Sequence, residues 1–369
     1  MGSRVLTVGM SEIIGGVERE ILAVISRCKD TSFDFLCYGS DYPYENELPE
    51  CRFFYLPYRR RHYFESQRKL KEFLKTHGNE YDLIWVNTSS ASNMSVQRIA
   101  KRYTSARVIT HSHSSRIEHE DPFLRTAHEI LHKLNQRKLV KSSDILVACS
   151  ESAAEHLFGK AHSKAHIVYN GIDTERFAFD ENSRQLKRKE LGISDSSTVL
   201  CFIGRLEAVK NIRFAVKVFT NYQELTANED VYLLLVGDGS ERRELEDLAA
   251  TGMIGNIRFL GAQNDVKPFL DASDILLMPS FFEGFPVSAI EAQANGLVCL
   301  LSDRITREAA VTDLVSFLGI EEKDITLWTE SITANKEKRD RTAYTAAVAE
   351  KGLDIDAVAR KMEDIFCNR

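Results

Sequence analysis

The sequence predicts an α/β protein of two doubly wound domains, each built on a parallel sheet. Short apolar and β-branched runs alternate with longer segments of helical period along the whole chain. This pattern restarts near residue 170, and 369 residues suit two domains of about 150–200 residues better than one core. The predicted strands are almost continuously apolar, which is typical of parallel sheets that helices cover on both faces.

In the first domain, residues 1–170, the predicted strands are 4–10, 33–39, 52–57, 82–87, 106–113 and 144–150. Segments of helical period lie between them, for example 18–27 and 65–75, and 166–173 reads as a strand that ends in a turn. In the second domain, residues 171–349, the predicted strands are 198–205, 231–239, 257–261, 274–280 and 297–303. Ligands of doubly wound domains bind at the carboxyl ends of the strands.

Composition and charge narrow the class of protein. The seven cysteines are scattered and none forms a C-x-x-C pair, which favours a reducing, cytoplasmic setting over a disulfide framework or a zinc site. No apolar run reaches the roughly 18–20 residues of a membrane-spanning helix. Residues 1–170 carry 24 Lys and Arg against 20 Asp and Glu, whereas residues 171–369 carry 24 against 34. The two domains are therefore expected to face different partners.

Two glutamates mark a strand–loop–helix segment of the second domain, FFEGFPVSAIEAQANG (281–296). Glu283 lies in the loop, and we place Glu291 about two turns into a helix that starts near Val287. The loop amides of 284–287, at the positive end of this helix, form an anion site. A loop carboxylate suits sugar hydroxyls and a helix carboxylate suits a ribose; the alternative is that both are solvated charges.

A second segment, FIGRLEAVKN (202–211), ends a buried strand at Gly204 and then presents Arg205 and Lys210. These two cations suit a pyrophosphate, although each alone is more often a surface residue. The phosphate-binding pattern G-x-x-x-x-G-K-[ST] is absent, and the turn at 237–239 lacks the third glycine of a dinucleotide-binding fingerprint. A P-loop protein and a nicotinamide-dependent dehydrogenase are both disfavoured.

The first domain carries weaker signals. Gly16, after Gly15, precedes a helix, where a small residue lets the backbone approach a ligand. His111 and His113 end a strand and suit a sugar contact; a metal site is the competing interpretation, but acidic and cysteine partners at the usual spacing are missing. The basic cluster 58–71 fits an anionic membrane surface, an acidic acceptor or a solvated loop, and the acidic total charge disfavours nucleic acid.

Together these motifs resemble glycosyltransferase family 4, the retaining family with the GT-B fold of two Rossmann-like domains facing a cleft. Glu283 and Glu291 match its E-x7-E motif, Gly204-Arg205 with Lys210-Asn211 match its phosphate-binding G-R…K-N motif, and Gly15-Gly16-Val17-Glu18 matches its G-G-x-E loop. The likeness covers nearly the whole chain. Segments 282–303 and 305–320 resemble bacterial capsular and exopolysaccharide transferases.

The resemblance implies a role for each of these residues. Arg205 and Lys210 bind the donor diphosphate and stabilise its departure without a metal ion, and Glu283 contacts the donor sugar. The other donor contacts are Gly16, Gly204, Leu260, Gly261, Phe285, Pro286, Val287 and Glu291. A histidine contacts the sugar at the reacting centre, with His111 favoured and His113 as the alternative.

The resemblance also implies the reaction and its partners. The second domain binds the donor, and the C-terminal helix, about 350–369, packs back on the acceptor-binding first domain. The expected enzyme moves a hexose from a nucleoside-diphosphate sugar, in the first instance UDP-linked, to a glycan or a polyprenyl-diphosphate-linked saccharide. It works at the cytoplasmic face of the membrane and needs no cofactor or metal. The alternatives are a nucleotide-sugar epimerase, a small-molecule glycosyltransferase and a non-catalytic nucleotide-sugar-binding protein.

Overall fold

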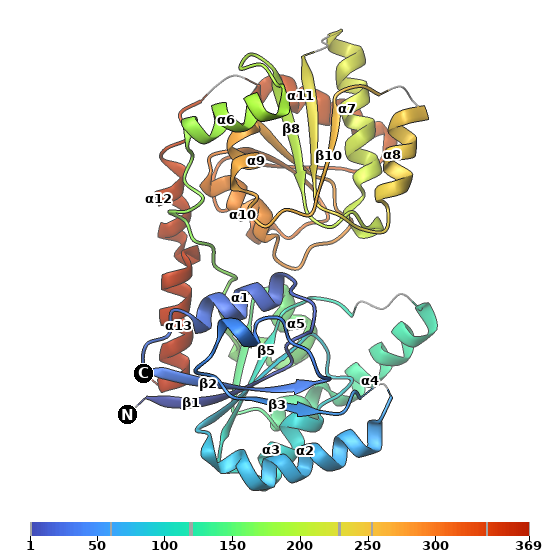
Figure 1. Ribbon diagram of the computed structural model, residues 1–369. Coiled ribbons are helices and arrows are strands. Elements are labelled where there is room, and N and C mark those ends of the chain that lie inside the picture. The colour runs from blue at the N-terminus through green and yellow to red at the C-terminus, as the bar shows by residue number, and fades with distance from the viewer. Residues whose placement is uncertain are drawn as a thin grey trace. The chain divides into compact units, whose positions relative to one another are not determined.

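The computed structural model describes residues 2–59, 61–117, 121–227, 230–251, 254–336 and 339–368. The chain forms two compact units (Figure 1): unit 1 is Met1–Gly171 with Ile355–Arg369, and unit 2 is Ile172–Asp354. The change from unit 1 to unit 2 falls one residue after the predicted boundary at 170. The return to unit 1 comes at residue 355, later than the predicted start near 350.

Unit 1 contains a seven-stranded parallel sheet in the order β3-β2-β1-β4-β5-β6-β7. Its strands are β1 (Ser3–Val8), β2 (Thr31–Tyr38), β3 (Phe53–Leu56), β4 (Leu83–Thr88), β5 (Arg107–Ser112), β6 (Ile145–Ala148) and β7 (His166–Ile167). Each of them overlaps a segment predicted as a strand, although β1, β2 and β4 extend one or two residues beyond it. The prediction for 166–173 was too long, because only its first two residues pair with β6.

Helices cover both faces of this sheet. They are α1 (Gly16–Ile25), α2 (Tyr63–His77), α3 (Ser95–Tyr103), α4 (Pro122–Lys141), α5 (Glu151–Phe158) and α13 (Ile355–Cys367). Val5 of β1 packs with residues of α1 and α13, whereas its neighbour Leu6 packs with residues of α2 and α3. Because successive strand residues point to opposite faces, α1 and α13 lie on one face of the sheet and α2 and α3 on the other.

The C-terminal helix α13 is an integral part of unit 1. Phe366, fully buried, meets Phe33 and Trp85 edge-on. A Cβ atom on Gly171 would lie 2.9 Å from Cα of Ile355, so this close approach requires glycine. The amide of Gly171 also donates a 2.9 Å hydrogen bond to Oε1 of the buried Glu20 in α1. Residue 369, the end of the predicted helix, lies outside the described residues.

Unit 2 contains a six-stranded parallel sheet in the order β10-β9-β8-β11-β12-β13. Its strands are β8 (Thr198–Ile203), β9 (Val231–Val236), β10 (Ile257–Gly261), β11 (Ile275–Met278), β12 (Val298–Ser302) and β13 (Val315–Leu318). The first five match the predicted strands. The edge strand β13, which pairs with β12, was not predicted.

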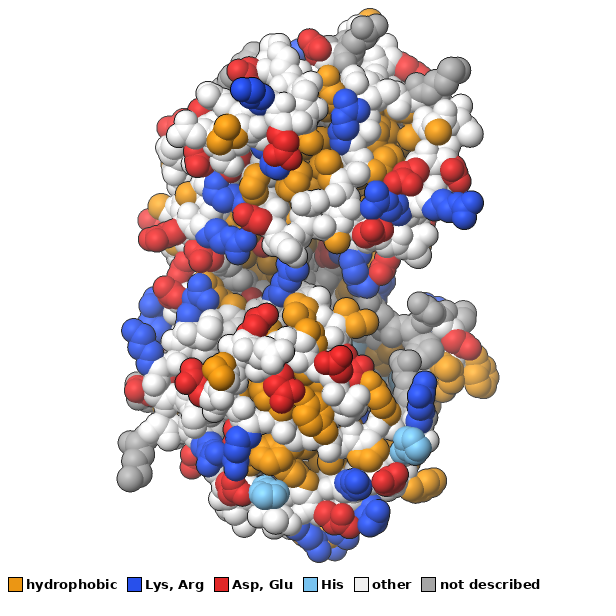
Figure 2. Space-filling model, in the orientation of Figure 1, with side chains coloured by type: hydrophobic (Ala, Val, Ile, Leu, Met, Phe, Trp, Pro, Cys, Tyr) orange, Lys and Arg blue, Asp and Glu red, His pale blue; other side chains and the backbone are white. Residues whose placement is uncertain are grey.

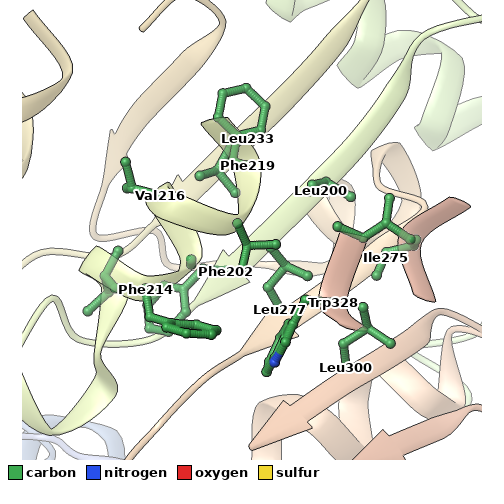
Figure 3. Close-up of a cluster of buried hydrophobic side chains, with 14 of the residues drawn as sticks. Leu200, Phe202, Phe214, Val216, Phe219, Leu233, Ile275, Leu277, Leu300 and Trp328 are labelled. Atoms are coloured by element: carbon green, nitrogen blue, oxygen red, sulfur yellow. The ribbon is translucent and has the colours of Figure 1, made fainter. Parts of the chain in front are cut away.

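The main core of unit 2 lies between its sheet and the helices α7 (Ile212–Thr226) and α11 (Ile325–Asn335) (Figure 3). Trp328 of α11 is fully buried, packs edge-on against Phe214, and donates its indole N–H to the carbonyl of Gly319 at 2.8 Å. The other helices of this unit are α6 (Glu181–Leu191), α8 (Arg242–Thr251), α9 (Lys267–Ala272), α10 (Val287–Ala294) and α12 (Tyr344–Val348).

Together the two sheets confirm the predicted α/β class with two parallel, doubly wound sheets. Within the ranges described above, no helix is both long and apolar enough to span a membrane.

Candidate functional site

Three loops of unit 2 meet at the carboxyl ends of its strands, where doubly wound domains bind ligands. The amide of Leu206, after β8, donates to the carbonyl of Asp238, after β9, at 2.8 Å. The amide of Glu241 donates back to the carbonyl of Leu206 at 2.9 Å, and the amide of Phe281, after β11, donates to the carbonyl of Val209 at 2.9 Å. The backbone therefore fixes the loops that carry the predicted donor residues.

Glycine makes the contact between the first two loops possible. Gly237 has φ +144°, and a Cβ atom there would lie 1.9 Å from the carbonyl oxygen of Gly204. A Cβ on Gly239 would lie 2.4 Å from the carbonyl oxygen of Leu206. The two glycines of the Gly-Asp-Gly turn thus serve close packing against the loop after β8.

Lys210 and Glu283 form the central contact of the site. The Lys210 ammonium lies 2.8 and 2.7 Å from the two carboxylate oxygens of Glu283, and the Ser280 hydroxyl donates a further 2.7 Å hydrogen bond to one of them. The two charged side chains are 20% and 10% exposed. Asn211, in the left-handed region with φ 54°, donates from Nδ2 to the carbonyl of Pro279 at 3.2 Å. The structure thus brings together two of the predicted catalytic residues.

Arg205 is held much more loosely than Lys210. Its side chain is 67% exposed, and its guanidinium lies 2.6 Å from the carboxylate of Glu207. Exposed pairs of this kind contribute about 0–1 kcal/mol, so the pair leaves Arg205 free to exchange partners. Arg205 follows Gly204 at the end of β8, on the same loop as Lys210.

The segment 284–287 leads into α10 with Phe285 and Pro286 buried. Two expectations need correction here. Glu291 lies one turn into α10 rather than two, because the helix begins at Val287. Pro286 has no N–H group, so it cannot supply one of the ligand-binding amides expected of 284–287. The half-buried Glu291 still lies on the helix that follows the Glu283 loop.

Leu260 and Gly261 end β10 beside the loop after β9. The carbonyl of Gly261, which has φ +68°, accepts the amide of Gly237 at 2.9 Å. The carbonyl of Leu260 accepts Nε2 of Gln263 at 2.6 Å. These two residues therefore lie at the same edge of the sheet as the predicted phosphate and sugar residues.

In unit 1, the two histidines occupy different depths of the sheet. His111 lies within β5, and its ring stacks on Trp85 with centroids 6.0 Å apart. His113 follows the end of β5, and its Nε2 lies 2.8 Å from Oδ1 of Asn87, whose Nδ2 donates to the carbonyl of Val8. Because Oδ1 of Asn87 is an acceptor, Nε2 of His113 carries the proton and Nδ1 is a bare acceptor.

Burial keeps both rings neutral. Burial lowers the pKa of His113 to about 3. Burial, together with repulsion from His113, lowers the pKa of His111 well below its ordinary value. Among the described residues, neither ring nitrogen of His111 has a hydrogen-bond partner. The same holds for Nδ1 of His113. Of the two, only His113 lies at the carboxyl edge of the sheet.

Gly16 is the first residue of α1, and a Cβ atom there would meet no atom within 4 Å. The loop before it is shaped by Glu18, whose carboxylate accepts the amide of Gly15 at 3.0 Å and the amide of Ser11 at 3.1 Å. The glutamate of the predicted G-G-x-E motif therefore has a visible structural role.

The basic cluster 58–71 forms part of a larger basic surface, apart from Arg60, which lies outside the described residues. Arg59 stacks on the ring of Tyr38 at 3.7 Å. A groove of about 530 Å³ between α2 and α3 is lined by Gln67, Arg68, Lys71, Arg98, Ile99, Arg102 and Tyr103. Residues 118–120, which come after the two histidines in the sequence, also lie outside the described residues.

Several supporting residues of the site were not predicted from the sequence. Ser280 and Glu207 bond to the predicted Glu283 and Arg205, and Asn87 orients His113. A polar residue at the end of a buried strand is the signal that finds Ser280 and Asn87, since each directly follows or ends an apolar run. The cations of α3 that line the groove gave no such signal.

Comparisons with known proteins cover nearly the whole chain. Residues 183–364 match the family model "Glycosyl transferases group 1", and residues 14–176 match the model "Glycosyltransferase Family 4". EpsF of Bacillus subtilis (strain 168), named as a glycosyltransferase, is 32% identical over 58% of this chain and 57% of its own length. An Escherichia coli enzyme, UDP-Gal:alpha-D-GlcNAc-diphosphoundecaprenol alpha-1,3-galactosyltransferase, is 27% identical over 81% of this chain and 79% of its own length.

Solved structures share the whole fold. Anabaena Alr3699/HepE, solved in complex with UDP, matches with a TM-score of 0.75 over 99% of this chain and 100% of its own, at 16% sequence identity. Its fold is the GT-B fold predicted from the motifs. Because one glycosyltransferase family model matches residues 14–176 and another matches residues 183–364, the chain belongs to the glycosyltransferases that these two models describe.

Proposed function

We propose that the protein is a retaining glycosyltransferase that moves a hexose from a UDP-sugar to a saccharide carried on polyprenyl diphosphate, in capsular or exopolysaccharide synthesis. The observation that carries the proposal is the Lys210–Glu283 contact at the carboxyl ends of β8 and β11. Two proteins similar to this chain support the choice of donor and acceptor: HepE was solved with UDP, and the Escherichia coli relative is named for UDP-galactose and a diphosphoundecaprenol acceptor.

In this proposal the second unit holds the donor. Arg205 and Lys210 bind the diphosphate, and their charges stabilise the negative charge that develops as it leaves. Glu283 accepts hydroxyl groups of the sugar, while Ser280 keeps its carboxylate oriented. Glu291 binds the ribose, Leu260 and Gly261 line the base, and Gly204 lets the backbone approach the phosphates. The amides of Phe285 and Val287 donate to sugar or phosphate oxygens.

Two protein cations take the place that a divalent metal holds in other phosphate-handling enzymes. A diphosphate bound between Arg205 and Lys210 meets one exposed guanidinium and one largely buried ammonium. We therefore propose that transfer proceeds without a metal ion.

In unit 1, the carboxyl ends of the strands are the region that meets the substrates. His113 and Gly16 contact the substrates there, with His111 as the other candidate for the histidine. We favour His113 because it follows the last residue of β5 and keeps Nδ1 as an acceptor for a sugar hydroxyl. We place the reaction at the cytoplasmic face of the membrane, where the α2–α3 groove and the basic cluster 58–71 are attracted to anionic headgroups.

The test is an assay with a panel of UDP-sugars and a polyprenyl-diphosphate-linked saccharide, read by nuclear magnetic resonance of the product. The proposal expects one sugar to be transferred with its anomeric configuration retained. An epimer formed without acceptor would identify a nucleotide-sugar epimerase, and transfer only to small free acceptors would identify a small-molecule glycosyltransferase. UDP binding with neither transfer nor hydrolysis would identify a non-catalytic binding protein.

A further inference from the structure

Helix α4 displays its large apolar side chains on the outside of unit 1. The exposed fractions are 80% for Phe123, 43% for Leu124, 56% for Ile130, 46% for Leu131 and 66% for Leu134. At 100° per residue these five, here called the apolar stripe, fall within a sector of about 120°. In Figure 2, hydrophobic side chains gather at the right-hand edge, where Figure 1 labels α4.

The rotation of α4 about its axis is fixed by the opposite side of the helix. His132 is 3% exposed, accepts the amide of Ala91 at 3.1 Å through Nδ1, and donates to the carbonyl of His156 at 2.9 Å through Nε2. Gln136 donates to the same carbonyl at 2.6 Å, and Leu139 is fully buried. The buried side of the helix thus combines polar groups with Leu139, while its widest apolar face points outward.

The charges of α4 are strongly one-sided. Its 20 residues contain the cations Arg125, Lys133, Arg137, Lys138 and Lys141, and a single acidic residue, Glu129. Four of these five cations lie in the C-terminal half of the helix, next to the last residue of the apolar stripe or after it. They are Lys133, Arg137, Lys138 and Lys141. An exposed apolar stripe with basic residues along it is the pattern of helices that lie in the interface of an anionic membrane.

We propose that α4 lies flat on an anionic lipid bilayer, with the apolar stripe in the boundary of the acyl chains and Lys133, Arg137, Lys138 and Lys141 among the headgroup phosphates. A second copy of this chain is a poorer occupant, because two α4 helices face to face would bring like charges together. The inference deepens the proposed function, since a polyprenyl-linked acceptor is met at a bilayer, but the contact does not require the transfer reaction.

The experiment is flotation of the full chain with vesicles of phosphatidylcholine alone and of phosphatidylcholine with one quarter phosphatidylglycerol. The test variant is Phe123→Ser with Leu134→Ser. The matched control is Leu186→Ser with Leu225→Ser, which changes two leucines on α6 and α7 that are 70% and 67% exposed. A charge variant, Lys138→Gln with Lys141→Gln, separates the electrostatic contribution. UDP binding by calorimetry reports separately on the donor site of each variant.

The expected result is binding to the anionic vesicles that weakens about tenfold or more in the stripe variant and is unchanged in the control. The charge variant and added salt should weaken binding to anionic vesicles, because headgroup attraction is screened. All variants should bind UDP like the parent protein. UDP binding thus tests the donor site of the proposed function, and vesicle binding tests the role of α4, so the two can fail independently. Equal vesicle binding by the stripe variant, no vesicle binding by the parent protein, or a parent dimer that the stripe variant dissociates would each overturn it.

Discussion

The Lys210 ammonium lies 2.8 and 2.7 Å from the two carboxylate oxygens of Glu283, and this contact ties the loop after β8 to the loop after β11. Both groups are largely withdrawn from water, and Ser280 supplies one further hydrogen bond to the carboxylate. Removal of either charge leaves its partner poorly compensated. The pair therefore couples the proposed diphosphate residue to the proposed sugar residue.

Substitution of either member of this pair should stop transfer. We expect Lys210→Ala and Glu283→Gln each to lower kcat/KM at least 100-fold, about 2.7 kcal/mol of transition-state stabilisation. The double variant should lose little more than either single variant, because the two side chains act together. Ser280→Ala should cost about tenfold, since it removes one oriented bond. Steady-state kinetics with circular dichroism as the folding control measures all four; additive losses in the double variant would refute the coupling.

Substitutions of the two histidines should have clearly different effects on transfer. His113→Ala should lower transfer by two or more orders of magnitude, because it removes the ring that Asn87 orients at the strand end. His111→Phe should keep the stacking on Trp85, and it removes two buried ring nitrogens that have no partners among the described residues. Transfer activity should therefore persist, and the free energy of unfolding should stay the same or increase. The reverse pattern, with activity lost only in His111→Phe, would assign the contact to His111.

Chelation tests the proposed role of the protein cations. If Arg205 and Lys210 neutralise the departing diphosphate, extensive dialysis against EDTA should change the transfer rate by less than about twofold. Addition of Mg²⁺ or Mn²⁺ should then give no gain. A loss of activity on dialysis that either ion restores would show that the two cations do not suffice.

Glu20 should make unit 1 less stable as the pH rises. Burial raises the pKa of its carboxyl to about 8, against the opposing hydrogen bond from Gly171 and the charge of Arg27. Between about pH 4.5 and 8 the folded chain therefore binds more protons than the unfolded chain. The contribution of Glu20 to the free energy of unfolding is therefore fully present below pH 4.5. It falls as the pH rises toward 8, by up to about 1.4 kcal/mol per pH unit.

Glu20→Gln keeps an oxygen for the Gly171 amide and cannot titrate. Urea unfolding at pH 5, 6, 7 and 8 should show a shallower dependence on pH for this variant and greater stability than the parent protein at pH 8. Glu330→Gln, at an exposed position of α11, is the matched control and should follow the parent protein. Parallel pH profiles for the parent and the Glu20 variant would contradict the burial of a protonated carboxyl.

The regular elements were predictable because parallel strands buried on both faces are nearly continuous apolar runs. β13 was missed because Val315–Leu318 is a four-residue edge strand, half-exposed throughout, whose pattern gives no clear period. The lost amide at Pro286 could have been read from the sequence. The pairing of Lys210 with Glu283, by contrast, depends on how two loops 73 residues apart fold against each other.

Helix α4 shows where periodicity misleads. A stripe such as Phe123, Ile130 and Leu134 ordinarily predicts the face that packs on a sheet. Here His132 and Gln136 find hydrogen-bond partners on α5 and turn the stripe outward. Only the three-dimensional arrangement shows which side of this helix is inside.

The central claim, that Arg205 and Lys210 hold a nucleoside diphosphate, is tested most directly by calorimetry of UDP binding to Arg205→Ala with Lys210→Ala. The matched control is Arg213→Ala with Lys217→Ala, two exposed cations of the neighbouring helix α7. The predicted result is a loss of affinity of at least 100-fold in the first variant and less than twofold in the control. Equal affinity of both double variants for UDP would contradict the claim.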